Sequence, residues 1–146
     1  MRTVKARQDH ALHLLRTTRD VWVATADRHG RPHLVPFSLD WDGSHVIAST
    51  STNSPTVRNV KASGLARLSV GDTRDVLLLD VQVKLVPVTE ADPRVSEHFN
   101  ARNHWDPRTT TTGDWVYLIM TPESVQAWQN EEELEGRTLM REGHWL

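Results

Sequence analysis

The segment Ser49-Thr-Ser-Thr-Asn-Ser-Pro-Thr-Val-Arg-Asn59 carries the residue pattern best suited to chemistry in this chain. Ser54 is a good helix N-cap, and Pro55 suits the first helical position because its missing N–H would have no partner there. The pattern predicts a helix N-terminus with free N–H groups and a positive dipole end, with hydroxyls around it and Arg58 one turn along. That is the chemistry of an anion site, most often for a phosphate. The alternative is a well-capped surface helix whose arginine meets only water.

Composition limits the classes of function. A chain of 146 residues with 38% apolar and 25% charged residues is typical of one globular domain, here residues 1–146. The formal charge of −2 provides no general field for a polyanion, so we expect no nucleic-acid partner. The absence of cysteine excludes disulfides and thiolate chemistry. No signal-peptide core or 18-residue apolar run is present, so we expect a cytoplasmic protein that has no membrane partner.

The elements around the anion segment are mostly short strands. We predict a helix over 3–17, strands over 21–26, 33–41 and 45–50, a helix from Ser54 to about Ala62, and strands over 65–70 and about 76–88. Asp42-Gly43 predicts a hairpin turn, and Pro36 requires an edge or a bulge because it cannot donate to a ladder. Towards the C-terminus we predict a helix over 92–103, a loop over 104–114, and strands over 115–120 and 124–128.

Six or seven strands in mostly antiparallel succession favour a mainly β protein with short helices. A small closed barrel would remove the unpaired edges that such a sheet exposes. An open α+β sheet is the alternative.

The order of these motifs resembles a known family. Gly30-Arg-Pro-His-Leu-Val-Pro36, the Asp-Gly turn, the strand ending at Ser49-Thr50 and the segment Ser54-Pro-Thr-Val-Arg-Asn59 follow one another as in the pyridoxamine 5′-phosphate oxidase-like family. This family has an antiparallel split β-barrel and binds FMN or the deazaflavin F420. The likeness runs from about Asp20 to the end of the chain. The segments 125–128 and 139–146 look like the family's short actinobacterial members.

The resemblance implies a cofactor site and a homodimer with that site at the interface. The strand matching 33–40 would border the cofactor ring, the strand end and turn over 49–56 would hold its phosphate, and Trp128 would reach the partner's cofactor. The implied cofactor-binding residues are Val35, Pro36, Phe37, Ser38, Ser49, Thr50, Ser51, Ser54, Thr56, Arg58, Asn59 and Trp128.

Two departures from the family pattern stand out. Many members carry a lysine or arginine where this chain has Thr56, so Arg58 would hold the phosphate with only hydroxyls assisting. The C-terminal Arg-x-His element of true pyridoxamine-phosphate oxidases has no match, because Arg137 and His144 are wrongly spaced. We therefore do not expect a vitamin B6 oxidase.

Other candidate groups have simpler interpretations. The histidine pairs are His10 with His13 and His29 with His33. No carboxylate stands at a convincing ligand spacing from either pair, so we expect no metal site. Asp40 and Asp42 could mimic a pair of catalytic carboxylates, but turn chemistry explains them. Trp22 and Trp115 lie in apolar runs and are assigned to the core. Trp128 and Trp145 are candidates for an interface or for cofactor stacking.

The residues and the resemblance together predict an F420- or FMN-dependent oxidoreductase. It would transfer a hydride between the bound cofactor and a small conjugated organic substrate, with a slight preference for F420. No side chain is assigned a catalytic role, since the cofactor carries the chemistry. The alternative is a split barrel that binds flavin or haem without turnover and serves as a carrier or sensor.

Overall fold

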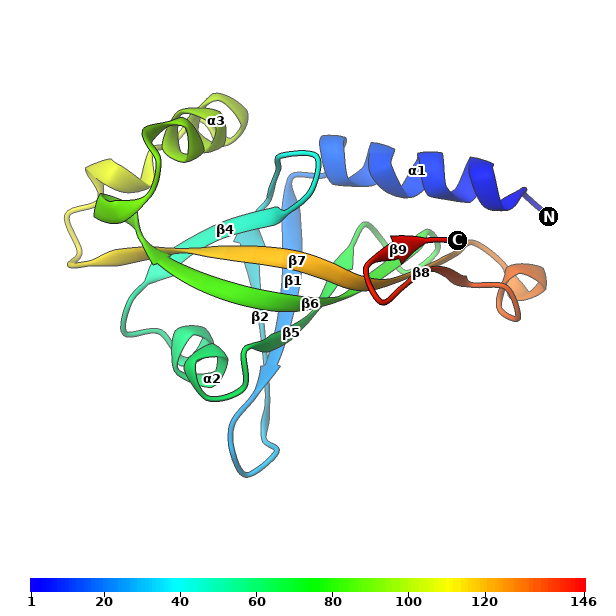
Figure 1. Cartoon of the computed structure of the whole chain (residues 1–146), viewed down its shortest axis with the longest axis horizontal. Coiled ribbons are helices and arrows are strands. Elements are labelled where there is room, and N and C mark those ends of the chain that lie inside the picture. The colour runs from blue at the N-terminus through cyan, green and yellow to red at the C-terminus, as the bar shows by residue number, and fades with distance from the viewer.

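The computed structural model describes all 146 residues and is mainly β (Figure 1). Its helices are α1 (Val4–Thr17), α2 (Pro55–Ser63) and α3 (Pro93–Asn103). Its strands are β1 (Asp20–Ala26), β2 (Pro32–Ser38), β3 (Asp40–Trp41), β4 (Val46–Ser51), β5 (Leu65–Val70), β6 (Val76–Pro87), β7 (Trp115–Trp128), β8 (Thr138–Arg141) and β9 (His144–Trp145). Single 3₁₀ turns lie at Val88–Glu90, Pro107–Thr109 and Glu131–Glu133.

The strands form one antiparallel sheet in the order β2-β1-β5-β6-β7-β4-β3, to which β8 and β9 add beyond β7. The sheet curls into a half-barrel, so that β2 approaches β4. Figure 1 shows α1 and α3 on one side of the long β6–β7 pair and α2 on the other. The expected antiparallel, split-barrel class is confirmed. Pro36 lies on β2, which pairs only with β1, so the predicted edge position is also confirmed.

Alternation of side chains along the strands builds the core. Leu77, Leu79 and Val81 of β6 are buried in the main apolar cluster, which α1 joins through Ala11 and Leu15. A smaller cluster lies under α3 and comprises Ile47, Val88, Phe99 and Tyr117. Because successive strand residues face opposite sides, β4 and β7 contribute to both clusters.

The β6–β7 pair is longer and more continuous than the sequence predicted. The pairing runs from Val76 opposite Trp128 to Pro87 opposite Val116, through Pro122, where we had expected a break. A register shift between Asp80 and Val81 accommodates this proline, because a bulge removes the need for its missing N–H.

Two predictions for the chain were wrong. Trp22 is 46% exposed, because Val21 and Val23 take the core-facing positions of β1 and leave Trp22 on the outer face. The C-terminal segment, to which we had assigned no strand, forms β8 and β9. Trp115 is half-buried and packs against the smaller cluster rather than in the main core.

None of the helices has the length and apolar character needed to cross a membrane.

A buried ion pair joins the two ends of the chain. The Glu133 carboxylate is fully buried and accepts hydrogen bonds of 3.0 and 2.8 Å from Arg2 and one of 2.9 Å from the Gln129 N–H. The Arg7 guanidinium, 4% exposed, lies 3.6 Å away. These contacts fix the start of α1 against the segment that leads into β8. The hydrogen bonds from Arg2 lower the pKa of Glu133 below its ordinary 4.5.

Substitution Glu133→Gln should lower the free energy of unfolding by about 2 kcal/mol at pH 7, the scale of lost charge-assisted hydrogen bonds. A carboxyl with a lowered pKa stabilises the fold above its unfolded pKa and loses that effect as pH falls through its folded pKa. The difference between wild type and variant should therefore shrink below about pH 4.5. Denaturant unfolding at pH 7 and pH 3.5 measures it. Glu132→Gln, at a mostly exposed neighbour, is the control and should change stability little; an equal effect of both variants would contradict the assignment.

Candidate functional site

Helix α2 begins and ends where local chemistry predicts. The Ser54 hydroxyl accepts a hydrogen bond of 3.3 Å from the Val57 N–H, and the Ser54 carbonyl accepts one of 3.1 Å from the Arg58 N–H. Gly64 ends the helix in the left-handed region, at a φ of 71°. The buried side chains of Val57 and Val60 hold α2 against the barrel. Its N-terminus is therefore fixed in orientation at the end of β4.

A pocket of about 280 Å³ opens at this N-terminus. It is lined by Thr52, Asn53, Ser54, Val57, Arg58 and Lys61. The side chains of Arg58 and Lys61 are exposed and form no ion pair with a carboxylate. Residues three apart on a helix share a face, so both cations reach the same pocket. Arg58 is the cation predicted from the sequence, and its helical spacing to Lys61 is the signal from which the second could have been found.

The loop that precedes α2 is tied to the 104–114 loop. The Thr52 backbone N–H and hydroxyl both donate to the Asp114 carbonyl, at 2.9 and 3.0 Å. Ser49 and Thr50 are 5% and 9% exposed, and the Ser49 hydroxyl donates to the Val116 carbonyl at 2.9 Å. Ser51 accepts from the Asn53 N–H at 3.4 Å. Of the predicted hydroxyls in this region, those of Thr52 and Ser54 line the pocket, while the Ser49 hydroxyl is bonded within the sheet.

Thr56 and Asn59 lie beneath α2 rather than in its pocket. Asn59 is 9% exposed and donates to the Thr25 hydroxyl of β1 at 3.1 Å. Thr56 is 1% exposed, and its Oγ1 has no hydrogen-bond partner. Position 56 therefore lies on the face of α2 that packs against the barrel. The binding role predicted for both residues stays a prediction.

The predicted ring-binding strand forms the free edge of the half-barrel. Val35 and Phe37 are half-buried and face inward, whereas Pro36 is exposed. Ser38 accepts a hydrogen bond of 3.3 Å from Trp105 Nε1. Because β2 approaches β4, this edge and the start of α2 belong to one region of the molecule.

Trp128 is separated from that region within one chain. It lies at the far end of β7, paired with Val76, whereas the residue opposite Ser51 is Trp115 at the beginning of the same strand. Its predicted place against a cofactor requires a second copy of the chain, and stays a prediction.

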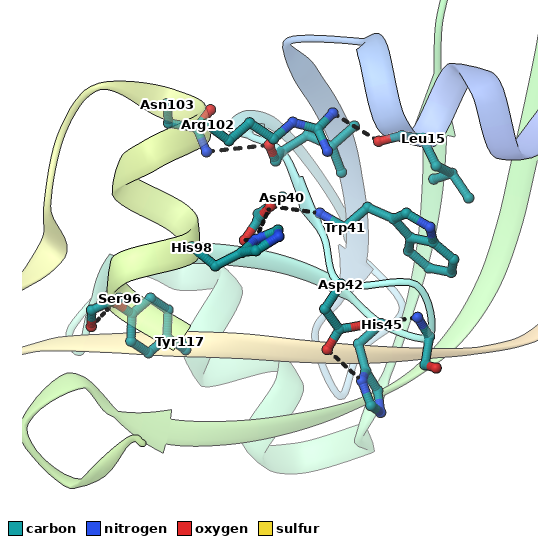
Figure 2. A network of polar contacts seen from close by, with 12 residues as sticks. Leu15, Asp40, Trp41, Asp42, His45, Ser96, His98, Arg102, Asn103 and Tyr117 are labelled. Atoms are coloured by element: carbon teal, nitrogen blue, oxygen red, sulfur yellow. Dashed lines mark hydrogen bonds and ion pairs between the residues drawn. The ribbon is translucent and has the colours of Figure 1, made fainter. Parts of the chain in front are cut away.

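A second polar network lies beside β3 (Figure 2). The Asp40 carboxylate is fully buried and accepts hydrogen bonds from the Trp41 N–H, at 2.9 Å, and from His98 Nδ1, at 2.8 and 2.9 Å. Asp42 accepts from the Ser44 and His45 N–H groups, as a turn residue should. The turn interpretation is thus confirmed for Asp42. Asp40 lies in β3, within the strand predicted over 33–41, and turn chemistry does not explain it, because its carboxylate is fully buried and accepts hydrogen bonds from His98.

Helix α3 is attached to this network at its C-terminal end. Arg102 donates to the carbonyls of Leu15 and Thr18 at 2.7 and 2.8 Å, and Asn103 donates to the Leu39 carbonyl at 3.2 Å. Burial lowers the pKa of Arg102, and the nearby charge of Asp40 opposes that shift. Tyr117 is hydrogen-bonded to Ser96 under α3, and burial raises its pKa.

A family model for pyridoxamine 5′-phosphate oxidase matches residues 8–134, which includes β2, β4, α2 and the Asp40 network. The chain belongs to the pyridoxamine 5′-phosphate oxidase family. The family assignment made from the ordered motifs is confirmed. A comparison with curated proteins gives no match.

Solved structures share the fold of this family member. An F420 reductase is 24% identical with a TM-score of 0.64, over 77% of this chain and 93% of the other. An FMN-binding protein related to pyridoxamine 5′-phosphate oxidase, from Nostoc punctiforme, is 14% identical with a TM-score of 0.59, over 88% and 86%. A haem-binding protein from Mycobacterium smegmatis is 11% identical with a TM-score of 0.70, over 90% and 56%. At these identities the likeness shows the fold.

The unpartnered Thr56 hydroxyl leads to a prediction about the stability of the ligand-free protein. Thr56→Val keeps the side-chain shape and removes a buried polar atom that no group satisfies, so it should raise the free energy of unfolding by about 1 kcal/mol. Denaturant unfolding measures the change. Ser49→Ala is the matched control, since it removes a buried hydroxyl that does have a partner and should lower stability by about 1 kcal/mol. Destabilisation by Thr56→Val would show that its hydroxyl is satisfied in solution.

Proposed function

We propose that this protein is an F420- or FMN-dependent oxidoreductase that transfers a hydride between its bound cofactor and a small conjugated organic substrate. The observation that supports this most directly is the pocket at the N-terminus of α2, where Arg58 and Lys61 are both free of carboxylate partners. Family membership supports the cofactor class, and the F420 reductase and FMN-binding protein share the fold.

The residues of the α2 pocket fit a phosphate group. The two cations supply charge, the Thr52 and Ser54 hydroxyls line the wall, and the first turn of α2 presents N–H groups with a positive dipole end. The backbone of Val35–Ser38 on the free edge would border the ring. The cofactor, when bound, supplies the hydride chemistry, and the protein binds, orients and shields it from water.

The enzyme we propose is a homodimer with the cofactor at the interface, completed by Trp128 of the second copy. We do not propose a vitamin B6 oxidase, because the Arg-x-His element has no match in the sequence. The α2 pocket contains no carboxylate, histidine or tyrosine, so we assign its residues to binding the cofactor and to no step of acid–base chemistry. The alternative, a carrier or sensor of flavin or haem, is kept because the haem-binding protein has this fold as well.

The first experiment is a titration of the purified protein with F420 and, separately, with FMN, followed by tryptophan fluorescence. Saturable quenching is expected for one of them. Arg58→Ala should weaken that binding about tenfold or more, the scale of one lost charge-assisted hydrogen bond, and Lys61→Ala somewhat less. Arg16→Ala is the matched control, since Arg16 is an exposed helical arginine on α1 and should leave the affinity unchanged.

The outcomes separate the alternatives. Binding that all three variants retain would show that the phosphate lies elsewhere. Binding of flavin or haem without reduction of any conjugated acceptor would favour the carrier. No binding of F420, FMN or haem would overturn the proposal.

A further inference from the structure

The outer side of β1 and β2 carries an exposed apolar patch. Trp22 is 46% exposed and Leu34 is 59% exposed. Trp22 pairs with Pro36 across the two strands, and Leu34 pairs with Ala24, the next outward residue of β1. Paired side chains on one face of a sheet lie about 5 Å apart, so these four residues form a continuous patch. Large apolar side chains that are exposed next to one another indicate a surface for a partner.

A hollow of about 440 Å³ adjoins this patch, and Ala24 belongs to both. Its walls include Ala26 of β1 and Leu65 and Ala66 of β5, and Leu65 is 53% exposed. We call the patch and the hollow together the β1 face. This face therefore has both projecting apolar side chains and a recess with apolar walls.

The charged residues of the hollow already have partners within the chain. The Arg67 guanidinium donates to both carboxylate oxygens of Asp80, at 2.7 and 3.1 Å. The Asp27 carboxylate accepts from the His29 and Arg31 N–H groups, at 2.8 and 2.9 Å. A strongly acidic or basic partner would find no free opposite charge in this hollow, whereas an apolar surface with its own charges paired is compatible with it.

The neighbouring edge of the sheet is a poorer place for a second copy. β2 pairs only with β1, so its other edge is free. Pro32 and Pro36 cannot donate hydrogen bonds, which interrupts this edge as a template for another strand. The β1 face instead presents the indole of Trp22, a side chain that is enriched among the residues that dominate binding at interfaces.

Trp128 lies on the same side of the sheet as Trp22. Trp22 pairs with Ser69, and Ser69 pairs with Leu78. Val76, two residues before Leu78, pairs with Trp128. Because paired residues share a face and every second residue of a strand does so too, the Trp128 side chain projects from the outer side. A partner must therefore approach this side to contact it.

We propose that two copies of this chain associate through the β1 face, which rests on the homodimer proposed above and assigns its interface. A two-fold interface uses the same surface on both copies, so that surface must complement itself. In the β1 face, the exposed side chains of Trp22 and Leu34 in one copy would pack against the hollow of the other, and the symmetric contact repeats this packing. Because Pro36 lies on β2, the strand predicted to border the ring, such a dimer places the second copy beside the proposed cofactor site.

The first test is sedimentation velocity over a range of protein concentrations. The wild-type protein should sediment as a dimer. Trp22→Glu should raise the dissociation constant of the dimer about 30-fold or more, the scale of a dominant interface residue, because the introduced charge would be buried against an apolar hollow. Leu34→Glu should act in the same direction. Val4→Glu is the matched control, since Val4 is 44% exposed on α1, and should leave the dissociation constant unchanged.

Far-UV circular dichroism checks that these variants remain folded. Both Trp22 and Leu34 project from the sheet within one copy, so their substitution should keep the wild-type spectrum. A second measurement does not depend on weakening the dimer. The chain contains no cysteine, so Leu34→Cys introduces a single thiol. Its reaction with a maleimide should be slow while this variant sediments as a dimer and fast after dilution to the monomer. Val4→Cys should react fast in both states.

The outcomes separate the interface from the proposed function. A wild-type protein that is monomeric at every concentration would overturn the interface. A dimer that both glutamate variants leave intact, or in which the Leu34→Cys thiol reacts fast, would also overturn it, while cofactor binding by that dimer would leave the proposed function standing. Dissociation of both glutamate variants, with the control still dimeric, would support the interface even if the wild-type dimer bound neither F420 nor FMN, a result that would count against the proposed function alone.

Discussion

The antiparallel pairing of β7 with both β6 and β4 is the constraint on which the rest of the structure depends. β7 continues through Pro122 only because the register shift opposite it removes a hydrogen bond that proline cannot make. With β7 unbroken, one strand contributes to the main core along most of its length, from Leu118 to Ala127, and its opposite face near the start contributes Tyr117 to the smaller cluster under α3. Its first residues fix β4, and β4 delivers the chain to α2.

This register sets the geometry of the pocket at the N-terminus of α2, where we propose that phosphate binds. Ser51 lies opposite Trp115, and the next residue, Thr52, is bonded twice to the Asp114 carbonyl. Only Asn53 separates that anchor from the N-cap of α2. A helix N-terminus held by a sheet on one side and by a loop on the other cannot swing away from an anion. A rigid site of this kind avoids the cost of ordering a loop when the ligand binds.

Structural features that depend only on a few neighbouring residues could be predicted from the sequence. Residue types and helical spacing alone predict three features of α2. These are the N-cap at Ser54, the end of the helix at Gly64, and the inward-facing side chains of Val57 and Val60. Asp40 and His98 could not be paired from the sequence, because 58 positions separate them and only the packing of α3 against β3 brings them together. Trp22 was misassigned because an apolar run does not reveal which of its alternating residues face outward. The second cation, Lys61, follows Arg58 by three residues, so helical spacing could have placed both at the pocket, but we had not assigned Lys61 to it.

Two pockets lie towards opposite ends of β4. Ile47, near its start, lines a pocket that Asp40 and His98 also line, and Thr52, just past its end, lines the pocket at the N-terminus of α2. Four residues lie between them, and the five steps along the chain from Ile47 to Thr52 span about 17 Å. A charged group held at α2 would then anchor an elongated molecule far from the reacting atoms. Binding energy gained at that remote contact can be used to orient the reacting end, which raises the rate only where the geometry there is fixed. At the other end of β4, the buried Asp40 carboxylate fixes the orientation of the His98 ring through Nδ1.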